Sequence, residues 1–289
     1  MSKKISIIIP FYHGNLYILR LLKSIETVAD LSKDLCCFEV LIVNDSPDES
    51  VVLPPSALDI KLIQNAQNVG IQKTRVHGLQ QASGEWILFL DQDDELISDG
   101  FLRQIQLTDY ADVIVGNGIY RLGDYDHRIF HTQKAMRFLI REKQFLTIRN
   151  LIPSPGECLI RKDCIPKTWT TSFLHTSGSD DWFLWITLFR SNARFTCNPE
   201  FVYLHNDTGG NNLSANLTQM KNSSLEMVEI LSRNHTLMPK QIAKLKRAIL
   251  FKYHQDTHQL SPKILLNCFD ALCANICYRL ILNTLNKIA

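Results

Sequence analysis

Four acidic side chains stand within five residues at Asp91-Gln92-Asp93-Asp94-Glu95, directly after the apolar run Trp86–Leu90. Like charges gathered at one strand end repel one another, and a bound divalent cation relieves that repulsion. Carboxylate oxygens are hard ligands that suit Mn²⁺ or Mg²⁺. Mg²⁺ usually binds through one or two carboxylates together with substrate phosphates, so the cluster predicts a metal site facing a nucleotide diphosphate. A solvated acidic turn that caps the next helix remains open as an alternative, because such turns are common.

The elements that must position this cluster alternate along the first half of the chain. Apolar runs rich in β-forming residues predict strands at residues 5–9, 38–43, 60–63, 86–90 and 113–115. A helix is predicted over 15–28, with Leu16, Leu19, Leu22 and Ile25 on one face, and another over 70–82. This alternation is typical of an α/β fold whose mostly parallel sheet carries helices on both faces.

Polar side chains follow three of the predicted strands. Pro10-Phe11-Tyr12 follows the first strand, Asn44-Asp45 follows the second, and the acidic cluster follows the run that ends at Leu90. In open α/β sheets, ligands bind beyond the carboxyl ends of the strands. We therefore expect these three strand ends to converge on one crevice.

The second half of the chain is less regular. It predicts a strand over 156–161, a helix over 180–189 capped by Ser179, and a strand over 201–205. Beyond Leu217 the pattern is helical to the end. We expect a catalytic domain over 1–216, with a nucleotide-sugar donor half at 1–96 and an acceptor half at 97–216, followed by a helical C-terminal extension over 217–289.

The composition narrows the class of protein. The chain has 289 residues, 45% of them hydrophobic, and a net charge of +2, which suits a globular protein with a sizeable core. No concentrated basic face indicates a nucleic-acid partner. The eight cysteines form no CxxC pair, so we expect buried, reduced thiols rather than a zinc site. The N-terminal apolar run is too short for a signal peptide, and we expect a cytoplasmic protein.

Several motifs together resemble glycosyltransferase family 2, whose members have the GT-A fold. The first two strands end in Ile-Ile-Ile-Pro10-Phe11-Tyr12 and Leu-Ile-Val-Asn44-Asp45. A third block reads Asn68-Val-Gly70, Arg75, Gly78-Leu79 and Ala82-Ser-Gly84-Glu85-Trp86, and runs into the Asp91-Gln-Asp93 motif. The resemblance is dense over residues 5–96 and thinner to about 215. It implies transfer of a sugar from a nucleotide diphosphate, expected to be a UDP-sugar.

The resemblance also implies roles for the donor half. Asp45 accepts a hydrogen bond from the uracil base, while Pro10 and Tyr12 wall the base and ribose. Asn68 belongs to the same donor-binding block. The remaining implied roles concern the diphosphate: Arg75 reaches it with its guanidinium group, Asp91 contacts the ribose or the metal's water shell, and Asp93 binds the Mn²⁺ or Mg²⁺ ion. An ordinary surface position for Arg75 and strand-end packing for Pro10 and Tyr12 remain open.

The segment Ser177-Gly-Ser-Asp180-Asp181-Trp182-Phe-Leu184 resembles the family's acid-Asp-x-x-Leu signature. It places the catalytic base of an inverting transfer at Asp181, which takes the proton of the acceptor hydroxyl. Asp180, Trp182 and His175 are expected on the acceptor side. The acidic pair could instead favour the positive N-terminal end of the helix. Tyr203-Leu-His205, with a later Asn211-Asn212-Leu-Ser214, is similar to a family segment whose histidine lies near the diphosphate or binds the metal.

This sequence departs from the family pattern in the donor half. Asn44 stands where the family has an acid, the turn after Asp45 is one residue short, and Val76 replaces the usual asparagine after the arginine. These differences leave the donor nucleotide open. The resemblance implies an acceptor that is a saccharide or a lipid-linked molecule, in cell-surface polysaccharide biosynthesis.

The C-terminal region has two features. Five basic residues and no acid occur in the stretch 240–252. Residues 262–289 are predicted to form one amphipathic helix with a narrow polar stripe. Its apolar face could dock on the catalytic domain, form a homodimer contact or touch a membrane surface as a peripheral anchor.

Two other classes of function remain open. A nucleotidyltransferase or a metal-dependent phosphohydrolase also presents paired aspartates to Mg²⁺, although the chain has neither a P-loop nor a Gly-x-Gly-x-x-Gly motif. A non-catalytic nucleotide-sugar-binding protein would keep the donor half, but it would have no need of Asp181.

Overall fold

The structure is a computed structural model, and it describes residues 3–123, 125–206 and 215–287. The chain divides into two units. One comprises residues 1–130, 154–165 and 193–209, and the other comprises residues 131–153, 166–192 and 210–289. We call them the sheet unit and the helical unit. Because the units interleave along the chain, the predicted boundary at residue 216 stays a prediction.

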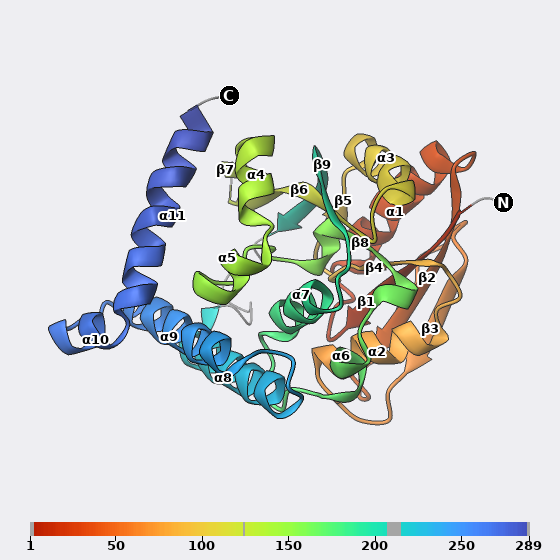
Figure 1. Cartoon of the computed structure of the whole chain (residues 1–289). Coiled ribbons are helices and arrows are strands. Elements are labelled where there is room, and N and C mark those ends of the chain that lie inside the picture. Colours follow the sequence, from red (N-terminus) through yellow and green to blue (C-terminus); the bar gives the residue numbers. More distant parts are fainter. Residues whose placement is uncertain (1–2, 124, 207–214, 288–289) are drawn as a thin grey trace. The chain divides into compact units, whose positions relative to one another are not determined.

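The sheet unit contains all the strands of the described residues (Figure 1). The strands are β1 Lys3–Phe11, β2 Cys36–Asn44, β3 Ile60–Gln64, β4 Trp86–Phe89, β5 Glu95–Leu96, β6 Val113–Leu122, β7 Tyr125–Arg128, β8 Cys158–Arg161 and β9 Phe195–Asn206. They form one sheet in the order β3-β2-β1-β4-β8-β6-β9-β5, with β7 paired to β6. The predicted parallel sheet is found in β3-β2-β1-β4. Antiparallel pairs then join β8 to β4 and β6, and β5 to β9.

Three helices cover this sheet: α1 Ile18–Ser32, α2 Ile71–Gln81 and α3 Ser98–Gln106. Alternate residues of a strand point to opposite faces. Ile5, Ile7 and Ile9 share a buried cluster with residues of α1 and α3. Ile8 faces α2 instead, and a Cβ added at Gly78 of that helix would lie 2.4 Å from Ile8 Cγ2. Glycine therefore allows α2 to approach the sheet closely.

The predicted face of the first helix was wrong at Leu16 and Leu19, whereas Leu22 and Ile25 are buried as expected. Leu16 is 84% exposed and Leu19 is 49% exposed, and the buried residues of α1 are Ile18, Leu21, Leu22, Ile25, Val28 and Ser32. Positions spaced by three drift by about 60° at each step around a helix of 3.6 residues per turn, so Leu16 to Ile25 cannot share one face. Residues 15–17 also form a turn before α1 begins.

The helical unit contains the remaining helices of the described residues. They are α4 Gln133–Leu139, α5 Glu142–Thr147, α6 Lys167–Thr171, α7 Asp180–Arg190, α8 Leu217–Arg233, α9 Pro239–Asp256, α10 Pro262–Asn267 and α11 Phe269–Lys287. Within this unit α9 packs beside α8, α5 and α11, and α11 also contacts α4 (Figure 1). None of the described helices is both long and apolar enough to span a bilayer.

Three further expectations for the second half and the cysteines need correction. The hydroxyl of Ser179 does not cap α7, because it is hydrogen-bonded to the Ser224 hydroxyl at 2.8 Å. The predicted helix over 262–289 is broken at Cys268, which is buried with Ala271 against Phe251 of α9. The cysteines are free thiols as expected, but Cys37, Cys273 and Cys277 are exposed.

Candidate active site

The end of β1 is joined directly to the acidic loop that follows β4. The backbone amide of Tyr12 donates to Gln92 Oε1 at 2.8 Å, and Gln92 Nε2 donates to the carbonyl oxygen of Tyr12 at 2.8 Å. The Tyr12 ring is 52% exposed, and Pro10 is half-buried within β1. The structure therefore brings two of the three predicted strand ends together. Sequence reasoning missed Gln92, because nothing in the motif distinguished it from a spacer.

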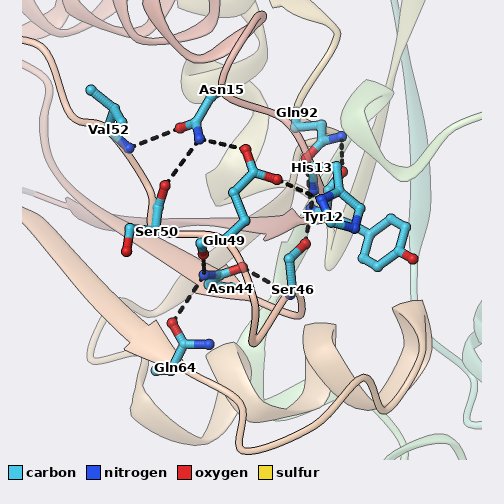
Figure 2. A network of polar contacts seen from close by, with 10 residues as sticks. All are labelled: Tyr12, His13, Asn15, Asn44, Ser46, Glu49, Ser50, Val52, Gln64 and Gln92. Carbon is cyan, nitrogen blue, oxygen red and sulfur yellow. Dashed lines mark hydrogen bonds and ion pairs between the residues drawn. The ribbon is translucent and has the colours of Figure 1, made fainter.

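The end of β2 is organised by Asn44 (Figure 2). Its Nδ2 donates to the carbonyl oxygen of Glu49 at 2.7 Å and to Gln64 Oε1 at 2.9 Å, and its Oδ1 accepts from Ser46 N at 2.9 Å. An ionised aspartate accepts hydrogen bonds but donates none. The asparagine that departs from the family pattern therefore matches the acceptors placed around it in this chain.

A second set of contacts ties the turn after β2 to the loop after β1 (Figure 2). Glu49 accepts from His13 Nδ1 and from Asn15 Nδ2, each at 2.5 Å. His13 N donates to the Ser46 hydroxyl at 2.8 Å, and Asn15 Oδ1 accepts from Val52 N at 2.8 Å. These residues hold the two loops together, so the exposed Tyr12 ring extends from a backbone that is fixed on both sides.

Asp45 is buried and accepts three hydrogen bonds from the loop that precedes α2. Its Oδ1 accepts from Asn65 Nδ2 at 2.8 Å and from Val69 N at 2.9 Å, and its Oδ2 accepts from Gly70 N at 3.0 Å. Gly70 has φ 85°, a conformation that favours glycine. Because a carboxylate has about four acceptor sites, Oδ2 keeps capacity for one further donor. Asn68 lies in the same loop and is exposed.

Arg75 and Asp91 form an ion pair. Arg75 is 3% exposed on α2, and its Nη2 lies 2.5 Å from Asp91 Oδ1. The sequence predicted both residues in the donor site, and the structure brings them together. Burial excludes the alternative of an ordinary surface position for Arg75.

Asp94 and His205 connect the acidic loop to the end of β9. The buried carboxylate of Asp94 accepts from the Tyr203 hydroxyl, from Asn206 N at 3.1 Å, and lies 3.0 Å from His205 Nδ1. Burial opposes protonation of His205, but the carboxylates of Asp94, Asp93 and Asp91 outweigh burial and raise the pKa of its imidazole. Asp94 is therefore a partner of the histidine, a role that the sequence did not reveal.

Asp93 differs from the other acids of the loop. Among the residues that the structure describes, its carboxylate is hydrogen-bonded to the backbone amide of Asp93 itself and pairs with no other side chain. Burial together with the negative charges of Asp94 and Asp91 raises its pKa to about 7. A cation bound at this carboxylate would relieve that cost.

The donor set around Asp93 fits a divalent cation that is completed by substrate. His205 engages Asp94 through Nδ1, which leaves Nε2 for a metal, and a carboxylate behind a ligating histidine is a common metal-site arrangement. Within residues 3–123, 125–206 and 215–287, no group of three or more His, Cys, Asp or Glu side chains is arranged to hold a metal. A cation held by Asp93 and His205 would therefore need water and phosphate oxygens, as Mg²⁺ sites usually do.

The predicted acceptor-side residues lie in the helical unit. Asp181 accepts from Asn150 Nδ2 at 2.7 Å and from Trp182 N at 2.6 Å. Trp182 is buried and donates through Nε1 to the carbonyl oxygen of Phe145, and Asp180 is buried. His175 is exposed, with Nδ1 lying 2.6 Å from Glu226 Oε1. The base role of Asp181 and the acceptor roles stay predictions, and residues 211–214 lie outside the described residues.

Comparisons with known proteins identify the family of this chain. Residues 6–169 match the family model described as Glycosyl transferase family 2. Over 204 residues the chain is 26% identical to the UDP-Glc:alpha-D-GlcNAc-diphosphoundecaprenol beta-1,3-glucosyltransferase WfgD of Escherichia coli, a match that covers 68% of this chain and 74% of WfgD. Other matches are shorter, and the chain covers 34% and 65% of the length of two Haemophilus influenzae glycosyltransferases.

Solved structures share the fold. The structure of Staphylococcus aureus TarS 1–349 in complex with UDP-GlcNAc aligns with a TM-score of 0.61 and 17% identity, covering 93% of this chain and 79% of that one. The mannosyltransferase PcManGT from Pyrobaculum calidifontis, in complex with GDP-Man and Mn²⁺, aligns with a TM-score of 0.57 and 17% identity, covering 100% of this chain and 81% of that one. The predicted α/β fold of the GT-A type is confirmed.

Proposed function

The chain belongs to glycosyl transferase family 2, and we propose that it is an inverting, metal-dependent glycosyltransferase. It moves a sugar from a nucleotide diphosphate, expected to be UDP, to a hydroxyl group of a saccharide or lipid-linked acceptor. The observation that carries this proposal is a set of contacts that links the ends of β1 and β2, directly or through α2, to the acidic loop after β4. Tyr12 is bonded to Gln92, Asp45 to Gly70, and Arg75 to Asp91.

The donor-binding roles follow from these contacts. Asp45 keeps an acceptor site on Oδ2 for a base NH, while the exposed Tyr12 ring and Pro10 offer a wall for the base and ribose. Asn68 belongs to the loop that Asp45 holds. Arg75 brings a buried positive charge beside Asp91, where it would stabilise the diphosphate. Structures titled with UDP-GlcNAc and with GDP-Man support a nucleotide-sugar donor.

Asp93 and His205 would hold the metal ion, Mn²⁺ or Mg²⁺. When bound, the ion would supply positive charge to the leaving diphosphate. The chemistry left to the chain is proton transfer and positioning. As the acceptor oxygen attacks the anomeric carbon, the bond from that carbon to the diphosphate oxygen breaks, and the diphosphate leaves with the electron pair. Asp181 takes the proton of the acceptor hydroxyl, with Asn150 orienting its carboxylate.

The proposal extends to the acceptor and the cellular context. The printed name of WfgD includes a diphosphoundecaprenol acceptor, which supports a lipid-linked acceptor in cell-surface polysaccharide biosynthesis. His175, Asp180 and Trp182 are proposed on the acceptor side. The division at residue 216 and a cytoplasmic location, at the inner face of the plasma membrane, belong to the same proposal. Phe269, Ile276 and Leu280 are exposed on α11 and leave a homodimer or a peripheral membrane contact open.

Calorimetry of UDP binding, with and without Mn²⁺, tests the donor site. We expect Asp93→Ala to lose the gain in UDP affinity that Mn²⁺ provides in the wild type. Asp45→Ala should weaken UDP binding in both conditions. Asp109→Ala is the matched control, because Asp109 is an exposed acid of the sheet unit that pairs with Lys3. If Asp93→Ala keeps the full metal-dependent gain, the metal assignment is wrong.

A second measurement separates an enzyme from a binding protein. Slow release of UDP from a panel of UDP-sugars, with Mn²⁺ and without acceptor, is expected of a transferase. Binding of a UDP-sugar without any turnover, even with saccharide acceptors, would favour the non-catalytic alternative.

A further inference from the structure

The acidic loop Asp91–Glu95 is held through its backbone by side-chain donors from two other elements. The carbonyl oxygen of Asp93 accepts from Arg20 Nη2 at 2.8 Å and from Asn206 Nδ2 at 3.1 Å. Arg20 lies on α1, and Asn206 is the last residue of β9. Two elements far apart in the sequence therefore meet at the carbonyl group of the residue proposed to bind the metal.

The same two donors meet at a second acceptor in the loop. Glu95 Oε1 lies 3.0 Å from Arg20 Nε and accepts from Asn206 Nδ2 at 3.2 Å. The carboxylate of Glu95 offsets the charge of Arg20, so the guanidinium group holds the loop without adding an unbalanced positive charge beside a cation site. Arg20 and Asn206 each contact both the Asp93 carbonyl group and the Glu95 carboxylate, so they restrict the loop more than a single contact would.

Asn206 also links this arrangement to His205. Its backbone N–H donates to Asp94 Oδ1 at 3.1 Å, while the preceding residue, His205, lies 3.0 Å from that same oxygen through Nδ1. Asn206 is only 8% exposed. One residue therefore contacts the loop through Asp93, Asp94 and Glu95 and adjoins the proposed histidine ligand.

We propose that Arg20 and Asn206 are positioning residues that set the distance and orientation of Asp93 relative to His205 before the metal arrives. Neither residue carries a metal ligand, and both act through the backbone of Asp93. Residues behind the direct ligands typically change metal affinity by about 10- to 100-fold when they are lost. This inference rests on the proposed role of Asp93 and His205 as metal ligands.

The test compares Asn206→Ala and Arg20→Ala with two matched controls. Asn198→Ala removes another buried asparagine of β9, whose Nδ2 donates to the carbonyl oxygen of Gly100 at 2.9 Å and not to the acidic loop. Arg103→Ala removes a surface arginine of α3 that bonds only Gln106 among the described residues. The readouts are the Kd of Mn²⁺ at saturating UDP by electron paramagnetic resonance, the metal-free UDP affinity by calorimetry, and Tm.

We expect Asn206→Ala and Arg20→Ala to raise the Kd of Mn²⁺ by about tenfold or more, with metal-free UDP affinity unchanged. Asn198→Ala should lower Tm by at least as much as Asn206→Ala does, and it should leave the Kd of Mn²⁺ unchanged. Arg20→Ala carries the test alone if Asn206→Ala does not fold.

The inference is wrong if the two variants bind Mn²⁺ as the wild type does, or if Asn198→Ala weakens Mn²⁺ equally. Should the wild type itself bind no Mn²⁺ with UDP, the proposed metal role is wrong and this inference falls with it. If the wild type and both variants bind Mn²⁺ equally well, the positioning role is wrong, but the proposed metal role is not affected.

Discussion

The sheet unit and the helical unit hold their predicted functional residues in different ways. In the sheet unit, three acids near the strand ends are held by partners from other parts of the fold. Asp45 binds a loop backbone, Asp91 pairs with Arg75, and Asp94 contacts His205. In the helical unit, Asp181 lies in the first turn of α7, and the His175 side chain is 92% exposed.

This difference agrees with the proposed roles, in which the sheet unit binds the donor and the helical unit supplies residues for the acceptor. A donor site assembled at strand ends is rigid before substrate binds, because several elements share each contact. Rigidity of that kind suits recognition of a diphosphate and a metal, whose geometry is fixed. Residues at a helix end and in an exposed loop have fewer such constraints, which suits the acceptor side proposed for them. Variants that change one unit alone test whether donor binding and acceptor activation are separable.

The largest effect is expected from Asp181→Asn. We expect turnover to fall by about 10²–10⁴-fold, because a positioned base contributes that much, while UDP affinity stays nearly unchanged. Steady-state rates and UDP calorimetry on the same protein check both expectations. Asp256→Asn, an acid of the same unit that pairs with Lys252, is the control. Near wild-type turnover in Asp181→Asn would remove this residue from the mechanism.

Acid should destabilise the sheet unit through Glu39. Burial raises the pKa of this carboxyl, but hydrogen bonds from Ser6, from Ser83 and from Lys4 outweigh burial and lower the pKa to about 2. A carboxyl with a depressed folded-state pKa stabilises the fold above its ordinary pKa of 4.5, and that contribution is lost as pH falls through about 2. The contribution is on the order of 1–3 kcal/mol.

Urea unfolding of the wild type and Glu39→Gln at pH 7, 4.5 and 2.5 measures this contribution. The free energy of unfolding should differ between the two proteins at pH 7, and the difference should shrink as pH falls toward 2.5. A difference that is constant over this range would contradict the assigned pKa.

A smaller effect is expected from Asn44→Asp, although this change restores the acid of the family pattern. The aspartate loses the donor to Glu49 O and to Gln64 Oε1, and adds a like charge beside Asp45. We expect UDP binding to weaken by about tenfold, which corresponds to about 1.4 kcal/mol, because the loss of these two contacts loosens the turn that carries Asp45. Adding Gln64→Lys supplies a donor and should recover part of the affinity. UDP binding equal to that of the wild type would mean that Asn44 is interchangeable with the acid.

Much of the sheet unit could be predicted because its pattern is local. Strand ends follow from apolar runs. The family resemblance indicated Arg75 and Asp91 as donor-site residues, and the structure pairs these two side chains. The partners of these residues could not be predicted. Gln92, Asn65 and Asn206 act through hydrogen bonds to backbone or side chains distant in sequence, and such contacts depend on how strands are ordered in the sheet.

The errors in helices have a similar cause. Residues 262–289 have one continuous periodicity, yet Cys268 breaks the helix because burial of Cys268 and Ala271 against α9 outweighs helix continuity. Serine is a common N-cap residue, but the hydroxyl of Ser179 is hydrogen-bonded to the hydroxyl of Ser224 instead. Tertiary contacts decided both outcomes, and a single sequence does not specify them.

The smallest effect concerns how α11 is held on α9. Arg247 contacts Asp270 through two hydrogen bonds of 2.8 and 2.7 Å, and the two side chains are 37% and 34% exposed. Solvent screens a pair of this exposure, so Arg247→Ala should lower the free energy of unfolding by only about 0.5–1 kcal/mol, and less in 1 M salt. Lys246→Ala, an exposed neighbour, is the control and should be neutral. A double-mutant cycle with Asp270→Ala isolates the coupling between the two side chains. Zero coupling would mean that α11 is held on α9 by the apolar contacts of Phe251, Cys268 and Ala271 alone.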